Sequence, residues 1–549
     1  MKLINFFLIS NEKKIIFVFF LGFLALGLIL YKDFGFNIDE KFQRANGFYW
    51  LNYLSEILNL HNLSFITNNK LNGISGHTLP DINEWNKYGI VFDLPAAIIE
   101  ILFDFKNDLQ SYQMRHLLTF LFFWLGSIFF YFLLRNRFNN IPLSLLGSIF
   151  LITTPRILGD SFHNNKDIIF LSLLIISIYF YFKFIDNKKK KDLIFLALFS
   201  ALASTIRILG IFVPISFFFF VLLNKLSNKK DFKFFDAFFL GIFFFIFLYI
   251  FWPAFWQNTY INIINFFDSF GKYGPPKIIF LDNYYKTNLL PYYYFIFWIF
   301  VSSPINHIVL FLTGFIFYFK RFILRFFKIK PNTIHNDLWR SKNENKDFLI
   351  FMCIVTFTLF FSLFNVNQYN GWRSGYFVYI FIIYFIVYSI FVFSRKKNKI
   401  LNIFLILIIF TSITYNIYRI SIYHPYQSIY FNILTSKKIK NSLDVDFTGL
   451  SSIHFLRKIL SEEENKKSEI KIGVASWYPI WFMFDLLEEN LKKKITFIDN
   501  KKLQEADYIY SNRIYEVDKK YFKKYDVPVF FKKQSYIKDN TIIYEFYKR

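Results

Sequence analysis

The sequence predicts an α-helical membrane protein that crosses the bilayer about eleven times and ends in a small α/β domain. Three observations predict this class: apolar runs recur up to residue 420, charged residues gather between the runs, and the pattern changes after residue 420. The chain has 549 residues, of which 55% are hydrophobic, and 82 of them are Phe. Apolar runs of about 18 or more residues are long enough to span the hydrocarbon core, so they indicate membrane spans.

The apolar runs predict the individual spans in order. The first lacks a small-residue cleavage site before "YKDFGF", so we interpret it as a retained anchor rather than a signal peptide. The stretch 192–223 is short for two crossings and has Arg207 at its centre, which predicts two short or broken helices that meet near the outer leaflet. Interfacial helices would raise the number of helices further. The predicted spans are residues 13–31, 115–134, 141–157, 167–184, 192–206, 208–223, 234–252, 292–318, 348–365, 375–394 and 400–418.

The distribution of charge orients these spans. The net charge is +25, and in a soluble protein such an excess would suggest a nucleic-acid partner. Here the basic clusters all fall on one side when the spans alternate, and the positive-inside rule makes that side cytoplasmic. We therefore predict membrane lipids and no nucleic acid as partners, a cytoplasmic N-terminus, and Asp39 and Glu40 on the outer side. The clusters are "NEKK" (11–14), "RNR" (135–137), "NKKKK" (187–191), "NKLSNKKDFK" (224–233), "KRFILRFFKIK" (320–330) and "RKKNK" (395–399).

The predicted outer side has four segments. The first outer loop, residues 32–114, contains the amphipathic stretches "KFQRANGFYWLNYLSEIL" and "DLPAAIIEILFDF", which we expect to lie along the membrane interface. Residues 158–166 are expected to form a short polar loop, and 253–291 a longer one. The division falls at residue 420: residues 1–420 form the membrane domain, and 421–549 an outer α/β domain. In the latter, "EIKIGVAS", "KITFID", "ADYIYSN", "VPVFF" and "NTIIYEFYKR" are predicted strands, and "YPIWFMFDLLEENLKK" a helix.

Two adjacent acids, Asp39 and Glu40, follow the first span within a few residues. Two acids at the start of a loop are ordinarily just solvated. These two are held near the bilayer surface between a span and an amphipathic stretch, where a carboxylate can accept a proton from a hydroxyl nucleophile.

Several cationic residues lie at the predicted outer-leaflet ends of spans. Lipid headgroups explain such arginines in general, because long basic side chains extend to the interface. Arg207, embedded in an apolar hairpin, is the hardest to explain that way. Guanidinium groups gathered at one leaflet suit a phosphate group there, since Arg forms bidentate bonds to phosphate oxygens. The outer-leaflet arginines are Arg115, Arg156, Arg207 and Arg373.

The stretch "GDSFHNNKD" adds His163, Lys166 and Asp167, and "YHPYQSIYFN" adds His424 at the outer interface. His163 is interpreted as a polar loop residue in preference to a metal ligand or general base. No pair of His residues has the spacing of a metal site, so the spacing supports no protein-bound cation. The sequence also lacks a Walker loop and the Gly-rich or GxSxG motifs, which leaves nucleotide hydrolysis unsupported.

Taken in order, these pieces resemble the GT-C fold glycosyltransferases, above all the family 39 group, which includes protein O-mannosyltransferases and bacterial aminoarabinose transferases. The resemblance covers most of residues 1–435. In one block Asn370 replaces an acid and Ser374 replaces a His of the family pattern, which leaves Arg373. The blocks that carry the resemblance are "TPRILGDSFHNNKDIIFLSL" (154–173), "STIRILGIFVP" (204–214), "YNGWRSGYF" (369–377) and "HPYQSIYFN" (424–432).

The resemblance implies transfer of a sugar from a polyprenyl-phosphate donor to a hydroxyl group of an envelope lipid, glycan or protein, on the outer face of a bacterial inner membrane. Asp39 would be the general base of an inverting reaction, and Glu40 would orient the acceptor or the loop. A divalent cation could bind through the donor phosphate with few protein ligands. The resemblance assigns Arg207, Arg156, Arg373 and Lys166 to the donor phosphate, and we add Arg115, His163, Asp167 and His424 as candidate substrate-binding residues.

Two other functions fit parts of this pattern. A transporter or flippase of a lipid-linked glycan would also need outer-leaflet arginines, but we expect it to show internal repeats or paired broken helices. The sequence has one such break, at 204–214. A surface-polysaccharide polymerase or ligase would carry its catalytic cluster on a large outer loop in the later half of the chain. One structural test separates the glycosyltransferase from these two alternatives. A glycosyltransferase needs Asp39 to face a cavity that also contains Arg207.

Overall fold

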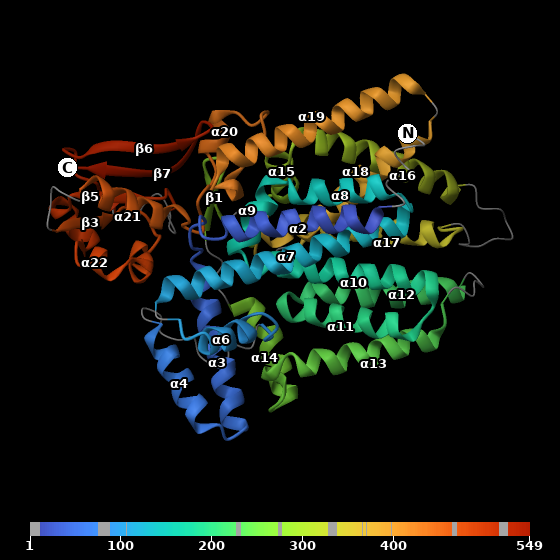
Figure 1. Ribbon diagram of the computed structural model, residues 1–549, viewed down its shortest axis with the longest axis horizontal. Helices are drawn as coiled ribbons and strands as arrows, with labels where there is room; N and C mark the ends of the chain where they lie inside the picture. Colours follow the sequence, from blue (N-terminus) through green and yellow to red (C-terminus); the bar gives the residue numbers. More distant parts are fainter. Residues whose placement is uncertain are drawn as a thin grey trace.

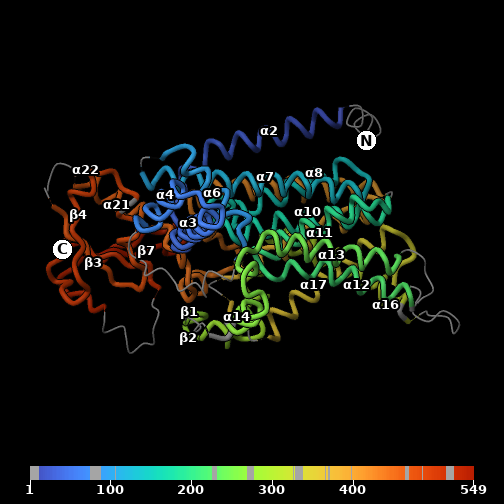
Figure 2. The backbone as a smooth tube through the Cα atoms, turned by 90° about the horizontal axis from the view of Figure 1, so that it is seen from below, coloured from blue at the N-terminus to red at the C-terminus, as the bar shows by residue number. Residues whose placement is uncertain are grey.

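A bundle of long helices makes up most of the molecule, and a five-stranded sheet lies at one end of it (Figure 1). Helices α3, α4 and α6 lie at the same end as the sheet, whereas α2 begins at the opposite end (Figure 2). The computed structural model describes residues 11–74, 88–105, 107–226, 232–272, 277–327, 338–364, 366–368, 371–396, 398–463, 469–514 and 525–549.

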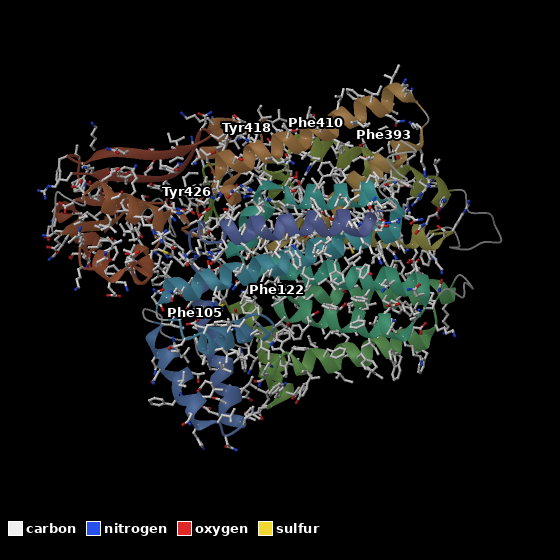
Figure 3. The ribbon with its side chains drawn as sticks, viewed as in Figure 1. Phe105, Phe122, Phe393, Phe410, Tyr418 and Tyr426 are labelled. Carbon is white, nitrogen blue, oxygen red and sulfur yellow. The ribbon has the colours of Figure 1, made fainter. Side chains whose placement is uncertain are left out.

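The helices of the bundle follow the apolar runs of the sequence. Large apolar side chains cover its outside, among them Phe410, which is 67% exposed, and Tyr418 (Figure 3). Such a surface suits contact with lipid rather than water. The helices before the sheet region are α2 (Glu12–Leu30), α3 (Asp39–Ile57), α4 (His61–Gly73), α6 (Asp93–Leu102), α7 (Asp108–Phe138), α8 (Ile141–Ile152), α9 (Pro155–His163), α10 (Asp167–Asn187), α11 (Lys190–Ile206), α12 (Phe212–Leu226), α13 (Phe234–Ile250), α14 (Thr259–Lys272), α15 (Tyr294–Ser302), α16 (Ile305–Phe327), α17 (Lys342–Leu363), α18 (Val378–Arg395) and α19 (Lys399–Tyr423).

Within the described residues, eight helices are long and apolar enough to cross a membrane, or nine if the bent pair α8 and α9 is one span. The chain is therefore a multi-pass membrane protein, and the predicted helical class is confirmed. Helices α11 and α13 are shorter, with 17 residues each. The predicted number of about eleven spans would require both of these helices to cross as well, so that number stays a prediction.

One loop prediction and one span prediction are wrong in detail. The predicted polar loop at 158–166 is mostly helix, because α9 continues from Pro155 to His163 after a 65° bend from α8. The predicted single span 292–318 is two helices, α15 and α16, with Pro304 in the break. Proline lacks the N–H that an interior helix position needs, so a break at this point is expected. The predicted break at Arg207 is confirmed: this residue is extended, with φ −144° and ψ 127°, between α11 and a turn of 3-10 helix, Ile208–Ile211.

In the first outer loop, the two amphipathic stretches form α3 and α6 as predicted, whereas α4 was not predicted. Arg44 on α3 joins these two helices, because its Nη2 donates to Glu100 Oε1 on α6 at 2.6 Å. A second cation–anion contact runs from Arg44 Nη1 to Asp108 Oδ1 at the start of α7, at 2.8 Å. The ionic contacts fix the direction in which α3 leaves the first span.

The C-terminal region forms an α/β unit, as predicted. Its sheet has the order β4-β3-β5-β7-β6, in which β3 lies parallel to β4 and β5, and β7 lies antiparallel to β5 and β6. Its strands are β3 (Ile470–Val474), β4 (Ile495–Phe497), β5 (Tyr508–Ser511), β6 (Lys532–Lys538) and β7 (Thr541–Lys548), and its helices are α20 (Lys437–Asn441), α21 (Ser451–Glu462) and α22 (Glu489–Lys492). A separate hairpin, β1 (Lys277–Phe280) and β2 (Asn283–Lys286), lies in the predicted 253–291 loop.

Two element predictions in this unit are wrong. "VPVFF" is not a strand, since β6 begins only after it, at Lys532. The predicted helix "YPIWFMFDLLEENLKK" is a 3-10 segment, Ile480–Leu486, followed by the single turn α22. The hairpin of β6 and β7 is attached to the last long helix at Asp539. That carboxylate binds Arg419 of α19, at 3.2 Å from Nη1, and Lys440 of α20, at 2.9 Å from Nζ.

Candidate active site

Asp39 is the first residue of α3, and its carboxylate meets a cation from a distant part of the chain. Arg373 Nη1 donates to Asp39 Oδ2 at 2.7 Å. The backbone N–H of Asp39 donates to Asn37 Oδ1 at 3.0 Å, which fixes the start of the helix. A carboxylate in the first turn is also stabilised by the helix dipole. Its side chain remains 42% exposed, so it is open to a reactant.

Two further cations lie within electrostatic reach of Asp39. The loss of part of its hydration would by itself raise the pKa of this carboxyl group, but the charge of Arg373 opposes that effect most strongly. Lys166 and Arg207 act in the same direction, and together the cations hold the pKa of Asp39 below its ordinary value. We call Asp39, Lys166, Arg207 and Arg373 the Asp39 cluster. The structure thus brings the predicted base together with three of the four predicted phosphate-binding residues.

Neighbouring side chains position Arg207 and Lys166. Arg207 Nε donates to Asp167 Oδ1 at 2.6 Å, and Asp167 Oδ2 accepts from Asn164 Nδ2 at 3.0 Å. The candidate substrate-binding residue Asp167 therefore orients Arg207. Lys166 Nζ lies 3.3 Å from the ring centroid of Tyr88. Burial would raise the pKa of the Tyr88 phenol, but the charge of Lys166, its hydrogen bond to the phenol and the charge of Arg207 together lower that pKa.

Arg156, the fourth predicted phosphate-binding residue, is buried in α9 and contacts different groups. Its Nε donates to the carbonyl oxygen of Tyr430 at 3.0 Å. Its guanidinium group also lies over the rings of Trp298 and Phe431, at 5.1 Å and 5.2 Å. These contacts tie α9 to the "HPYQSIYFN" block, and none of them joins Arg156 to Asp39. Its assignment to the donor phosphate stays a prediction.

The other predicted site residues lie around the cluster with partners of their own. Glu40 is buried, accepts from the backbone N–H of Asn37 at 2.8 Å, and lies 3.1 Å from His116 Nε2. Arg115 is 1% exposed and pairs with Asp93 at 3.5 Å. These contacts suit holding the loop and α3 in place.

The two predicted histidines are not in the Asp39 cluster. His163 is buried, and its Nε2 lies 3.8 Å from Asp160 Oδ1 on the same helix. His424 Nε2 lies 3.1 Å from Asp33 Oδ2, and its Nδ1 accepts from Gln427 at 2.9 Å. Of the replaced family positions, Ser374 is buried beside Arg373, and Asn370 lies outside the described residues.

The C-terminal unit reaches the cluster directly. The backbone N–H of Ile38 donates to the carbonyl oxygen of Thr448 at 3.0 Å, next to Asp39. The guanidinium group of Arg373 lies over the ring of Phe447, 5.6 Å from its centroid. The segment before α21 therefore forms one wall of the site, which the sequence motifs did not predict.

A pocket beside the cluster contains residues that the sequence did not single out. Its lining includes Gln43, Tyr88, Asp93, Asn165 and Lys166. Only Lys166 was predicted, and Asn165 lies next to it in "GDSFHNNKD". No signal in the sequence separates Tyr88 or Gln43 from many other interfacial residues. Among the described residues, no group of three or more His, Cys, Asp or Glu side chains could hold a metal ion.

Comparison with known proteins adds a family match. No curated protein matches the chain. Among solved structures, the chain is similar to ArnT from Cupriavidus metallidurans in the apo state, with 8% identity and a TM-score of 0.49, over 96% of this chain and 97% of that chain. The same protein bound to undecaprenyl phosphate gives 8% identity and a TM-score of 0.47 over the same shares. Likeness at this level carries no information on activity.

Residues 94–252 match the family model described as dolichyl-phosphate-mannose-protein mannosyltransferase. The matched region runs from α6 to the end of α13 and contains Lys166, Asp167 and Arg207. The match therefore confirms the resemblance that the sequence motifs indicate, to GT-C fold membrane glycosyltransferases of the family 39 type.

Proposed function

We propose that the protein is an integral-membrane glycosyltransferase that moves a monosaccharide from a polyprenyl-phosphate donor to a hydroxyl group of an envelope lipid, glycan or protein. The observation that carries the proposal is the Asp39 cluster, in which an accessible carboxylate stands among three cations. A base and an anion-binding group are the two elements that this transfer needs. The family match over 94–252 supports a lipid-phosphate donor.

In the proposed reaction Asp39 takes the proton of the acceptor hydroxyl as its oxygen attacks the anomeric carbon. The bond between that carbon and the phosphate oxygen breaks, and polyprenyl phosphate leaves with the bonding electrons. Attack from the side opposite the phosphate inverts the configuration of the sugar. The charge that develops on the phosphate is stabilised by Lys166, Arg207 and Arg373, since preorganised cations lower the energy of such a transition state.

The ion pair of Asp39 and Arg373 suggests how the base becomes available. Arg373 is bonded to Asp39 at 2.7 Å, which makes the carboxylate a weak base. A donor phosphate competes for the same guanidinium group, because Arg binds phosphate oxygens in bidentate fashion. Binding of the donor would thus release Asp39 and increase its basicity at the moment that the reaction requires it.

We place the reaction on the outer face of a bacterial inner membrane. The arrangement of the helices supports this proposal, since α3, α4, α6 and the sheet lie together at the end of the bundle where α2 finishes (Figure 1). The basic clusters of the sequence belong to the other ends of the spans, which the positive-inside rule assigns to the cytoplasm.

The experiment that tests the proposal is the change Asp39→Asn in the full chain reconstituted in lipid. We expect the release of polyprenyl phosphate from radiolabelled polyprenyl-phosphate mannose, with envelope extract as acceptor, to fall by about 10²–10⁴-fold, the usual contribution of a general base. Asn keeps the size of the side chain, so thermal unfolding should show a folded protein.

Asp104→Asn is the matched control, because Asp104 is an exposed acid on the same outer loop and lies at a left-handed φ of 43° that Asn tolerates. Its transfer rate should equal that of the wild type. Full transfer by the Asp39→Asn protein would show that Asp39 is not the general base of the reaction.

A further inference from the structure

The pocket beside the Asp39 cluster is lined by residues that adjoin the cluster in sequence and in space. Gln43 follows Asp39 by four residues on α3, so both side chains lie on one face of that helix. Lys166 belongs to the pocket and to the cluster, and Ile206 of the pocket lining directly precedes Arg207. The pocket therefore shares Lys166 with the Asp39 cluster and borders it through Gln43 and Ile206.

Two buried oxygens of this pocket have no hydrogen-bond donor among the residues that the structure describes. They are Gln43 Oε1 and Asn165 Oδ1, on residues that are 6% and 5% exposed. Buried polar side-chain atoms are ordinarily paired, and each exception needs an explanation. A ligand that carries hydroxyl donors would satisfy both acceptors in the lining of this one pocket.

Asp93 adds a third acceptor to the pocket. One of its oxygens, Oδ2, accepts from Asn46 Nδ2 at 2.8 Å, and the other, Oδ1, lies 3.5 Å from Arg115 Nη1. The buried guanidinium group of Arg115 balances the charge of Asp93. Asp93 therefore offers hydrogen-bond acceptors to the pocket without making the pocket negatively charged. Lys166 adds a cation to the wall, which disfavours a positively charged ligand.

We propose that this pocket recognises hydroxyl groups of the transferred sugar, and that the sugar is a neutral monosaccharide. The inference rests on the proposed function and extends it to the class of sugar. Hydroxyl groups on one edge of the ring donate to Gln43 Oε1 and Asn165 Oδ1, which satisfies both orphan acceptors. The pocket is too small for a whole ring, so the rest of the sugar lies at its mouth, next to Asp39.

The test compares the binding of bare polyprenyl phosphate with that of polyprenyl-phosphate mannose, using the full chain in lipid nanodiscs. We expect the wild type to bind the mannose-bearing lipid more tightly. Gln43→Leu, which removes the acceptor at similar volume, should weaken binding of the mannose-bearing lipid about tenfold, the usual worth of one hydrogen bond. The same variant should bind bare polyprenyl phosphate as the wild type does, which also shows that it is folded.

Asn165→Leu should behave in the same way as Gln43→Leu. The matched control is Gln110→Leu, since Gln110 is an exposed glutamine at the start of α7 and should change neither affinity. Equal weakening of both lipids by Gln43→Leu would overturn the sugar subsite and leave the proposed function standing. Tighter binding of a polyprenyl-phosphate amino sugar would overturn the neutral class. Failure of the wild type to bind either lipid would overturn the inference and the proposed function together.

Discussion

Single residues of the Asp39 cluster determine how the proposed reaction should depend on pH. The pKa of Asp39 is depressed, so its carboxylate stays ionised below the pH at which an ordinary Asp takes up a proton, about 4. An activity that needs the ionised form is then retained above the depressed pKa and is lost only as the pH falls through it. The cation that contributes most to this depression is Arg373.

Replacing Arg373 should therefore move the acid limb of the pH profile. In Arg373→Gln we expect the limb of kcat/KM to shift to higher pH, because the carboxylate loses its nearest positive charge. The maximal rate should also fall, since the phosphate loses a cation. The measurement is kcat/KM against pH for both proteins, and it reports on the free enzyme. An unchanged limb with a lower rate would mean that Asp39 is not the titrating group.

Arg207 should affect the donor more than the acceptor. We expect Arg207→Ala to lower kcat/KM for the donor by about 10²–10³-fold and to leave the KM of the acceptor unchanged. The change also leaves Asp167 buried without its cation, which is costly in itself. Arg207→Ala combined with Asp167→Asn therefore serves as the control: it should restore thermal stability but not use of the donor. Equal effects on donor and acceptor would indicate a structural role for Arg207.

At the scale of elements, the turn between α2 and α3 decides where Asp39 points. This turn packs against the segment before α21, where Ile38 bonds to Thr448. Gly35 lies so close to the carbonyl group of Leu450 that a Cβ atom would overlap its oxygen. The position needs glycine for this close approach of two backbones rather than for an unusual dihedral angle.

The change Gly35→Ala should thus separate the C-terminal unit from α3. We expect lower thermal stability, and a loss of transfer larger than the loss of donor binding, because the turn carries Asp39, whereas Lys166 and Arg207, two of the proposed phosphate-binding cations, lie on other elements. Gly73→Ala at the end of α4 is the control, since a Cβ there meets no atom within 4 Å. Wild-type transfer by Gly35→Ala would show that the contact does not position Asp39.

At the scale of the whole molecule, the orientation in the membrane can be tested by labelling. Cys353 is fully buried, so newly introduced thiols would dominate the reaction with a membrane-impermeant maleimide in whole cells. We expect Glu505→Cys, in the C-terminal unit, to be labelled in intact cells. Lys189→Cys, between α10 and α11, should react only after the membrane is permeabilised. The reverse pattern would place the Asp39 cluster on the cytoplasmic side.

Most of the fold was accessible from the sequence, because apolar runs and basic clusters are dictated by the bilayer. The failures are local: Pro304 divides an apolar run that looks continuous, and α9 is a helix although Arg156, Asp160, Ser161 and His163 interrupt its apolar residues. In the site, Arg373 is 334 residues from Asp39, yet the two form one ion pair. The alternation of apolar spans and basic clusters placed both residues at the same leaflet. No rule of sequence spacing predicts that their side chains touch. Gln43 and Tyr88 were missed because only the folded backbone brings them to Lys166.

The wall that Phe447 and Thr448 form beside Asp39 has a consequence for biosynthesis. Everything on the first span and α3 is made and inserted early, whereas the sheet that supports this wall closes only with β7. The backbone N–H of Arg549, which follows β7, donates to the carbonyl oxygen of Asp507, which precedes β5, at 3.0 Å. A nascent chain with all of its spans in the membrane therefore lacks a finished site.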